Sequence, residues 1–152
     1  MEKYFLDKNW TKIVVFNMLS FSKKIEYGLI ALRYMASLGE GELVPAKEIS
    51  DKYRISYELL AKVLQKLTKA GIINSFYGVN GGYALAKPPD KIKLSEVIQA
   101  LEGKSHINIV TCNTTDPESC DIFDRCTIKT PLSKIQSVIN NMFNEISISE
   151  IL

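Results

Sequence analysis

The chain has 152 residues, enough for one domain or a domain with an appendage, and 46% are hydrophobic, enough for a core. No stretch approaches the roughly 18 apolar residues of a membrane span, and the N-terminus lacks a secretion-signal pattern. Three cysteines are not a disulfide framework, so a cytoplasmic protein is expected. The net charge of +2 excludes little, because it hides a local bias: six basic and three acidic residues over 47–69 (+3), and two basic and four acidic over 104–126 (−2).

Residues 1–18 form an N-terminal extension to which the sequence assigns no role. The run Ile13-Val14-Val15-Phe16 is apolar but has no helical or strand period. Two interpretations stay open. The extension is either an upstream translated segment, with Met18 as the natural start, or an extra element packed on the domain.

Residues 22–71 predict three helices, the last two arranged as a helix-turn-helix. A broad apolar helix covers 22–38 with Ser22 as its cap, and a short helix covers 45–53. Arg54 and Ile55 form the turn. From Ser56 to Gly71 one amphipathic helix is predicted, because its apolar residues fall at i, i+3, i+4 and i+7. These residues are Leu60, Val63, Leu64 and Leu67.

Residues 72–77 and 83–86 predict two short strands around a glycine-rich tip at 78–82. A helix followed by such a hairpin is the end of a winged helix, so the fold class is mainly α with a small β-hairpin. The helix would enter the DNA major groove and the wing would lie along the backbone or minor groove. We expect Tyr77 to pack partly against the domain. The candidate DNA contacts are Ser22, Lys24, Ser56, Tyr57, Glu58, Ala61, Lys62, Gln65, Lys66, Tyr77, Gly78, Asn80, Gly81 and Gly82.

Charge alone does not decide the role of the lysines at 62, 66 and 69, because an ordinary solvated helix face would look the same.

Beyond the wing, a helix capped by Ser95 should end at Gly103, and a long helix should begin at Thr130-Pro131. Its apolar stripe either packs back on its own domain or pairs with a second subunit. A homodimer is favoured, because DNA readers of this size usually need two half-sites. The stripe consists of Ile135, Val138, Ile139, Met142, Phe143 and Ile146.

The predicted organisation is therefore a winged helix-turn-helix domain over 19–103, a cysteine-containing sensor loop over 104–130, and a dimerisation helix with a tail over 131–152. The loop holds Cys112, Cys120 and Cys126 within 15 residues, as C-x7-C-x5-C. Clustered thiolates on a loop are typical ligands of iron–sulfur clusters and of zinc. The alternative is three unmetallated thiols, one of them a redox switch.

With these elements in order, residues 19–152 resemble the Rrf-two family of bacterial transcription regulators, which has IscR-, NsrR- and CymR-like members. The resemblance is carried by residues 22–29 (SKKIEYGL), 55–56, 64–67 (LQKL), 70–73 (AGII), 81–83 (GGY), 85–86 and the three cysteines. It implies a dimeric winged-helix protein that binds near-palindromic operators.

The resemblance also suggests a fourth ligand for a three-cysteine cluster. IscR-like members place a histidine where this chain has Lys129, which cannot serve while protonated. NsrR-like members use a carboxylate from the partner subunit's first helix, and Glu26 occupies that position. His106, the one histidine, is the reserve candidate. Tyr77 and Ala61 replace an arginine and a glutamate of other members, so a different operator is expected.

The function expected from the sequence is a repressor whose operator affinity depends on an iron–sulfur cluster that senses redox state, nitric oxide or cluster supply. A cluster-free regulator controlled by thiol oxidation or by a partner protein is the alternative. A different class is an iron–sulfur electron carrier. An enzyme is not expected, because the chain has no Ser/His/Asp set, phosphate loop or C-x-x-C, and no small-molecule substrate is expected either.

Overall fold

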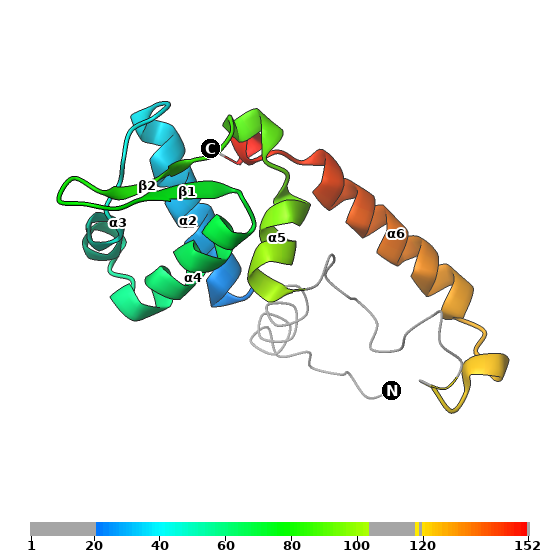
Figure 1. The fold of residues 1–152 in the computed structure, drawn as a ribbon. Coiled ribbons are helices and arrows are strands. Elements are labelled where there is room, and N and C mark those ends of the chain that lie inside the picture. The colour runs from blue at the N-terminus through cyan, green and yellow to red at the C-terminus, as the bar shows by residue number, and fades with distance from the viewer. Residues whose placement is uncertain (1–20, 104–117, 119, 152) are drawn as a thin grey trace, which may run out of the picture.

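The computed structural model describes residues 21–103, 118 and 120–151. These residues form a mainly helical fold with one two-stranded antiparallel hairpin, as the sequence predicts (Figure 1). The main elements are α2 (Lys23–Leu38), α3 (Ala46–Tyr53), α4 (Tyr57–Lys69), β1 (Ile73–Phe76), β2 (Gly82–Leu85), α5 (Leu94–Glu102) and α6 (Lys129–Glu145). Short 3-10 turns are η1 (Pro89–Lys91), η3 (Phe123–Arg125) and η4 (Ile148–Glu150). The predicted extension at residues 1–18 lies outside the described residues.

The core lies where α2, α4 and α5 meet. Helix α2 packs against both of the others, and its glycine permits a close approach. A Cβ atom on Gly28 would lie 2.6 Å from Cδ1 of Leu101 and 3.6 Å from Cγ1 of Val63. The predicted stripe of α4, Leu60, Val63, Leu64 and Leu67, is buried in this core, as are Val97, Ile98 and Leu101 of α5.

Helices α3 and α4 form the predicted helix-turn-helix. Ile49, Ile55 and Leu60 are buried between the two helices and the core. Helix α3 is also tied to α2, because the Tyr34 hydroxyl donates to the Glu48 carboxylate at 2.5 Å. This hydrogen bond raises the pKa of Tyr34 above its ordinary value.

The wing is held along β2 by a residue outside the hairpin. Val44 and Tyr83 exchange two backbone hydrogen bonds of 2.9 Å, which adds a third extended segment to the paired strands. The hairpin itself pairs Ile73 with Leu85 and Phe76 with Gly82. A Cβ atom on Gly82 would lie 2.8 Å from the Val44 carbonyl, so glycine is required for this close approach.

Two predicted helix starts are wrong by two residues. Helix α5 begins at Leu94, with Lys93 as its N-cap rather than Ser95, and the Lys93 N–H donates to the Glu96 carboxylate at 3.4 Å. Helix α6 begins at Lys129, so Thr130 lies inside its first turn and is not a cap. In both places backbone hydrogen bonding starts before the residue whose side chain favours a cap.

Helix α6 extends away from the winged-helix unit, and only its C-terminal end packs back (Figure 1). The Phe143 ring lies 6.2 Å from the Phe21 ring, and the Leu94 N–H donates to the Ile146 carbonyl at 2.9 Å. After the helix, Ile148 is buried in the core. The rest of the predicted stripe stays open, with Ile135, Val138 and Met142 exposed by 49%, 68% and 46%. None of the described helices is long and apolar enough to cross a membrane.

Candidate nucleic-acid interface

The outer face of α4 carries most of the predicted DNA contacts. Tyr57, Glu58, Lys62 and Gln65 are exposed, and Ala61 is half-buried beside them. This polar face exists because Leu60, Val63, Leu64 and Leu67 turn the other side of α4 toward the core, while Leu59 stays half exposed. Ser56 is the N-cap by backbone position, but its side chain makes no cap hydrogen bond.

A groove of about 570 Å³ separates α4 from the wing. It brings together predicted residues from both elements: Tyr57 and Gln65 from α4, and Tyr77, Gly81 and Gly82 from the wing. The groove's other polar residues are not among the contacts predicted from the sequence: Lys47, Thr68, Lys69, Ser75 and Tyr83. The helical period could have found Thr68 and Lys69, because they lie three and four residues after Gln65 on the same face. Lys47 comes from α3, and no pattern in the sequence around it indicates that it faces the groove.

The wing tip is solvated. Tyr77 is 98% exposed, so the expected partial packing of this ring is wrong within the described chain. Val79 beside it is also fully exposed, and Gly78 has a φ of +121°. A tyrosine and a valine exposed at a hairpin tip bury almost no surface in the described fold, so they are free to contact another molecule.

Two predicted DNA contacts point instead at the end of α5. The Lys66 ammonium donates to the Leu101 carbonyl at 2.7 Å, and the Ser22 hydroxyl donates to the Glu102 carboxylate. Lys24 is exposed. Helix α5 ends immediately before the cysteine-containing loop, and these two hydrogen bonds tie its last turn to α2 and α4.

The described part of the loop holds two of the three cysteines. Cys120 and Cys126 are half-buried free thiols on either side of η3, while Cys112 and His106 lie outside the described residues. Within the described ranges, no three His, Cys, Asp or Glu side chains are grouped closely enough to hold a metal ion. The Lys129 ammonium lies 3.6 Å from the centre of the Phe123 ring.

Glu26, the expected fourth ligand, lies in the first turn of α2. Its carboxylate accepts a hydrogen bond from the Lys23 ammonium at 2.5 Å, and this interaction raises the pKa of Lys23 above its ordinary value. The Glu26 side chain is 40% exposed, so a partner subunit could reach it.

A family model described as an iron-dependent transcriptional regulator, Rrf2, matches residues 21–152. The chain belongs to the Rrf2 family. It is therefore a DNA-binding transcription regulator and not an enzyme, as the sequence predicts. The winged helix and the groove described above are the elements through which such a protein contacts DNA.

Solved structures of Rrf2 proteins share the fold. CymR (YrzC), the global cysteine regulator of B. subtilis, has a TM-score of 0.64 and 24% identity, over 88% of this chain and 95% of its own. IscR of T. potens has a TM-score of 0.64 and 26% identity, over 88% of this chain and 85% of its own. The oxidised form of CymR from Staphylococcus aureus has a TM-score of 0.64 and 23% identity, over 86% of this chain and 93% of its own.

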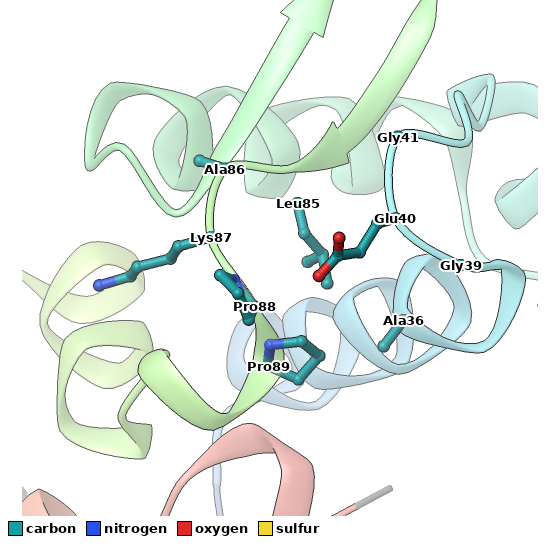
Figure 2. A pocket seen from close by; sticks show the side chains of 9 residues that line it. All are labelled: Ala36, Gly39, Glu40, Gly41, Leu85, Ala86, Lys87, Pro88 and Pro89. Atoms are coloured by element: carbon teal, nitrogen blue, oxygen red, sulfur yellow. The ribbon is translucent and has the colours of Figure 1, made fainter.

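A smaller hollow of about 260 Å³ lies behind the wing of this Rrf2 protein, between the α2–α3 connection and the segment after β2 (Figure 2). Leu85, Pro88 and Pro89 line one side, and Glu40 lies over the other. Lys87 also lines the hollow, but its side chain points away from it (Figure 2), and its ammonium pairs with the Glu96 carboxylate at 2.8 Å. None of the predicted site residues is in this hollow.

Proposed function

We propose that this Rrf2 protein is a homodimeric repressor that acts in the cytoplasm and reads its operator with α4 and the wing. The observation that carries the proposal is the groove between these two elements, because it joins the exposed polar face of α4 to the solvated wing. The residues proposed to contact DNA are those predicted from the sequence, with Lys47, Thr68 and Lys69 of the groove added. Lys66 and Ser22 are excepted, because their polar groups are engaged with α5.

The proposed dimer forms through α6. Ile135, Val138 and Met142 make an exposed apolar stripe on a helix that lies away from its own domain. An apolar stripe of this kind on a 17-residue helix is stabilised when a second copy covers it. Two-fold symmetry would then present two recognition helices to a near-palindromic operator.

The proposed signal is an iron–sulfur cluster held by Cys112, Cys120 and Cys126, with Glu26 of the second protomer as fourth ligand. Two features support this donor set. Cys120 and Cys126 are free, half-buried thiols on either side of the single turn of η3, and Glu26 is accessible on the first turn of α2. Lys129 is unsuited as a ligand, because its ammonium group is a cation that already stacks on Phe123. When bound, the cluster would supply a redox-active group that oxygen or nitric oxide can alter.

A regulator without a cluster is the second candidate. The observation in its favour is the likeness to two CymR structures, one of them an oxidised form. In that case oxidation of the half-buried thiols Cys120 and Cys126, or a partner protein, would be the signal. Membership of a transcription regulator family argues against the electron carrier.

The test combines metal analysis with DNA binding. Protein purified without oxygen is assayed for iron, acid-labile sulfide and zinc, and its affinity is measured for a duplex selected from a random library by the wild-type protein. We expect iron and sulfide in equal amounts, lost in Cys112→Ala and decreased in Glu26→Gln but not in the matched carboxylate control Asp124→Asn.

The outcomes separate the candidates. Removal of the cluster should change the affinity for the selected duplex. A metal-free dimer that binds the duplex and responds to a thiol oxidant would favour the cluster-free regulator. Protein that selects no duplex in either state would overturn the repressor itself.

A further inference from the structure

Arg54, in the turn between α3 and α4, has a backbone conformation that arginine rarely adopts. Its φ is +52° and its ψ is +41°, which is the left-handed region, and among the described residues it is the sole non-glycine residue with a positive φ. Glycine is the usual residue at the end of a helix in this conformation, because a Cβ atom is strained there. Keeping an arginine at this position costs stability.

The turn around Arg54 is fixed by a single buried serine. The Arg54 N–H and the Ile55 N–H both donate to the Ser50 carbonyl, the latter at 3.0 Å. The Ser50 hydroxyl, which is buried, donates in turn to the Ile55 carbonyl at 2.7 Å. Because Ile55 is itself buried in the core, the conformation of Arg54 is imposed on it from both sides.

The strained residue gains nothing from the rest of the described chain. The Arg54 side chain is exposed and makes no hydrogen bond or ion pair with any residue that the structure describes. The neighbouring charges of α3 do have partners. The Lys47 ammonium lies 3.8 Å from the Asp51 carboxylate, and the Lys52 ammonium lies 3.9 Å from the centre of the Tyr34 ring.

We propose that Arg54 binds a backbone phosphate of operator DNA at the point where α4 enters the DNA major groove. The proposal rests on the DNA-binding surface described above, since Arg54 lies two residues before Ser56 and so beside the first turn of α4. A guanidinium group that is exposed and unpaired, on a backbone fixed by hydrogen bonds, suits a phosphate, which it can bind with two parallel N–H donors. This residue is not among the contacts predicted from the sequence.

The test exploits the opposite effects that the proposal predicts for stability and binding. Arg54→Gly relieves the backbone strain and should raise the melting temperature by a few degrees. The same change should weaken binding to the selected duplex about tenfold at low salt. The slope of log K for DNA binding against log [KCl] should also become shallower by about 0.9 per subunit. This is the change expected when one phosphate contact, and the counterion that it releases, is lost.

Two further variants separate charge from backbone effects. Arg54→Asn tolerates the left-handed conformation but has no charge, so it should weaken binding as Arg54→Gly does. Arg125→Asn removes an equal charge in η3, at the end of α6 that lies away from α4 (Figure 1), and should leave the salt dependence unchanged.

The results also distinguish this proposal from the proposed function. If the wild-type protein binds the duplex and Arg54→Gly and Arg54→Asn bind it equally well with the same salt dependence, the phosphate contact is refuted while the repressor stands. A loss in Arg54→Gly that Arg54→Asn does not share would refute it as well, because the cause would then be a loosened turn. Absence of binding by the wild-type protein would overturn both.

Discussion

The ammonium group of Lys66 lies 2.7 Å from the carbonyl oxygen of Leu101, so the recognition helix is bonded to the last turn of α5. A carbonyl near the C-terminus of a helix has no partner within the helix, and a cation is favourable there. The Leu101 side chain is buried against Gly28 and its carbonyl accepts from Lys66, so one residue joins α2, α4 and α5. Helix α5 leads directly into the cysteine-containing loop, so this hydrogen bond links α4 to the segment that precedes the loop.

Lys66→Met should therefore lower stability and leave DNA binding nearly intact. Methionine keeps the length of the side chain but cannot donate to the Leu101 carbonyl, so the loss is about 1 kcal/mol, or a melting temperature lower by about 2–4 °C. Because the ammonium group is already engaged, the salt dependence of binding to the selected duplex should not change.

Lys62→Met is the matched control, four residues earlier on α4. Lys62 is exposed and makes no hydrogen bond or ion pair with the part of the chain that the structure describes. Its loss should leave the melting temperature unchanged and reduce the salt slope by about one per subunit. If Lys66→Met altered the salt slope and Lys62→Met did not, the roles assigned to the two lysines would be reversed.

Gly28→Ala should destabilise the protein by about 1–3 kcal/mol, because the new methyl group overpacks the α2–α5 contact. Ideal geometry places it 2.6 Å from Cδ1 of Leu101. Leu101→Val removes both Cδ carbons, so the double variant should lose less stability than the sum of the single changes. Additive losses in urea unfolding would show that the methyl group clashes elsewhere.

The sequence was sufficient for the helices, the hairpin and most of the core, because each depends on local periodicity. Leu60, Val63, Leu64 and Leu67 are apolar at helical spacing and buried as predicted. Partners distant in sequence left no such signal. Lys66 and Ser22 bond to α5 across 35 and 80 residues, and a periodic pattern on one helix cannot identify an acceptor on another.

The candidate site was predicted in part, for a related reason. Exposed polar residues on α4 follow from its buried stripe, so Tyr57 and Gln65 could be named in advance. Lys47 enters the groove only through the packing of α3 on α4. Arg54 was recognised as a turn residue, but its left-handed backbone depends on the two hydrogen bonds to the Ser50 carbonyl, which sequence does not reveal.

Val138→Asp should dissociate the proposed dimer. Val138 is 68% exposed at the middle of the α6 stripe, and an aspartate there would place two like charges in a buried interface. Asn141→Asp adds the same charge one turn later at an exposed polar position and should leave the dimer intact. Sedimentation velocity distinguishes the two states. A Val138→Asp dimer as tight as the wild type would exclude this face as the interface.

The stability of the C-terminal segment around Glu150 should decrease at acid pH. Its carboxylate accepts hydrogen bonds of 2.8 Å from the Ser147 N–H and hydroxyl, and these bonds hold its pKa below the ordinary value of 4.5. The unfolded chain then binds a proton more readily than the folded chain. The stabilisation is therefore complete above pH 4.5 and is lost as the pH falls through the lower pKa of the folded state.

Glu150→Gln should remove this dependence. At neutral pH the variant should have a lower melting temperature, because the amide accepts more weakly than the carboxylate and Ser147 helps to hold the buried Ile148. Below pH 4.5 the difference from the wild type should shrink as Glu150 is protonated. Glu145→Gln is a suitable control, since Glu145 accepts its hydrogen bond from Lys93 through the backbone carbonyl, which the substitution retains. The melting temperatures of the wild type and of Glu150→Gln are compared from neutral pH to acid. A difference that stays the same at every pH would show that the carboxylate does not hold η4.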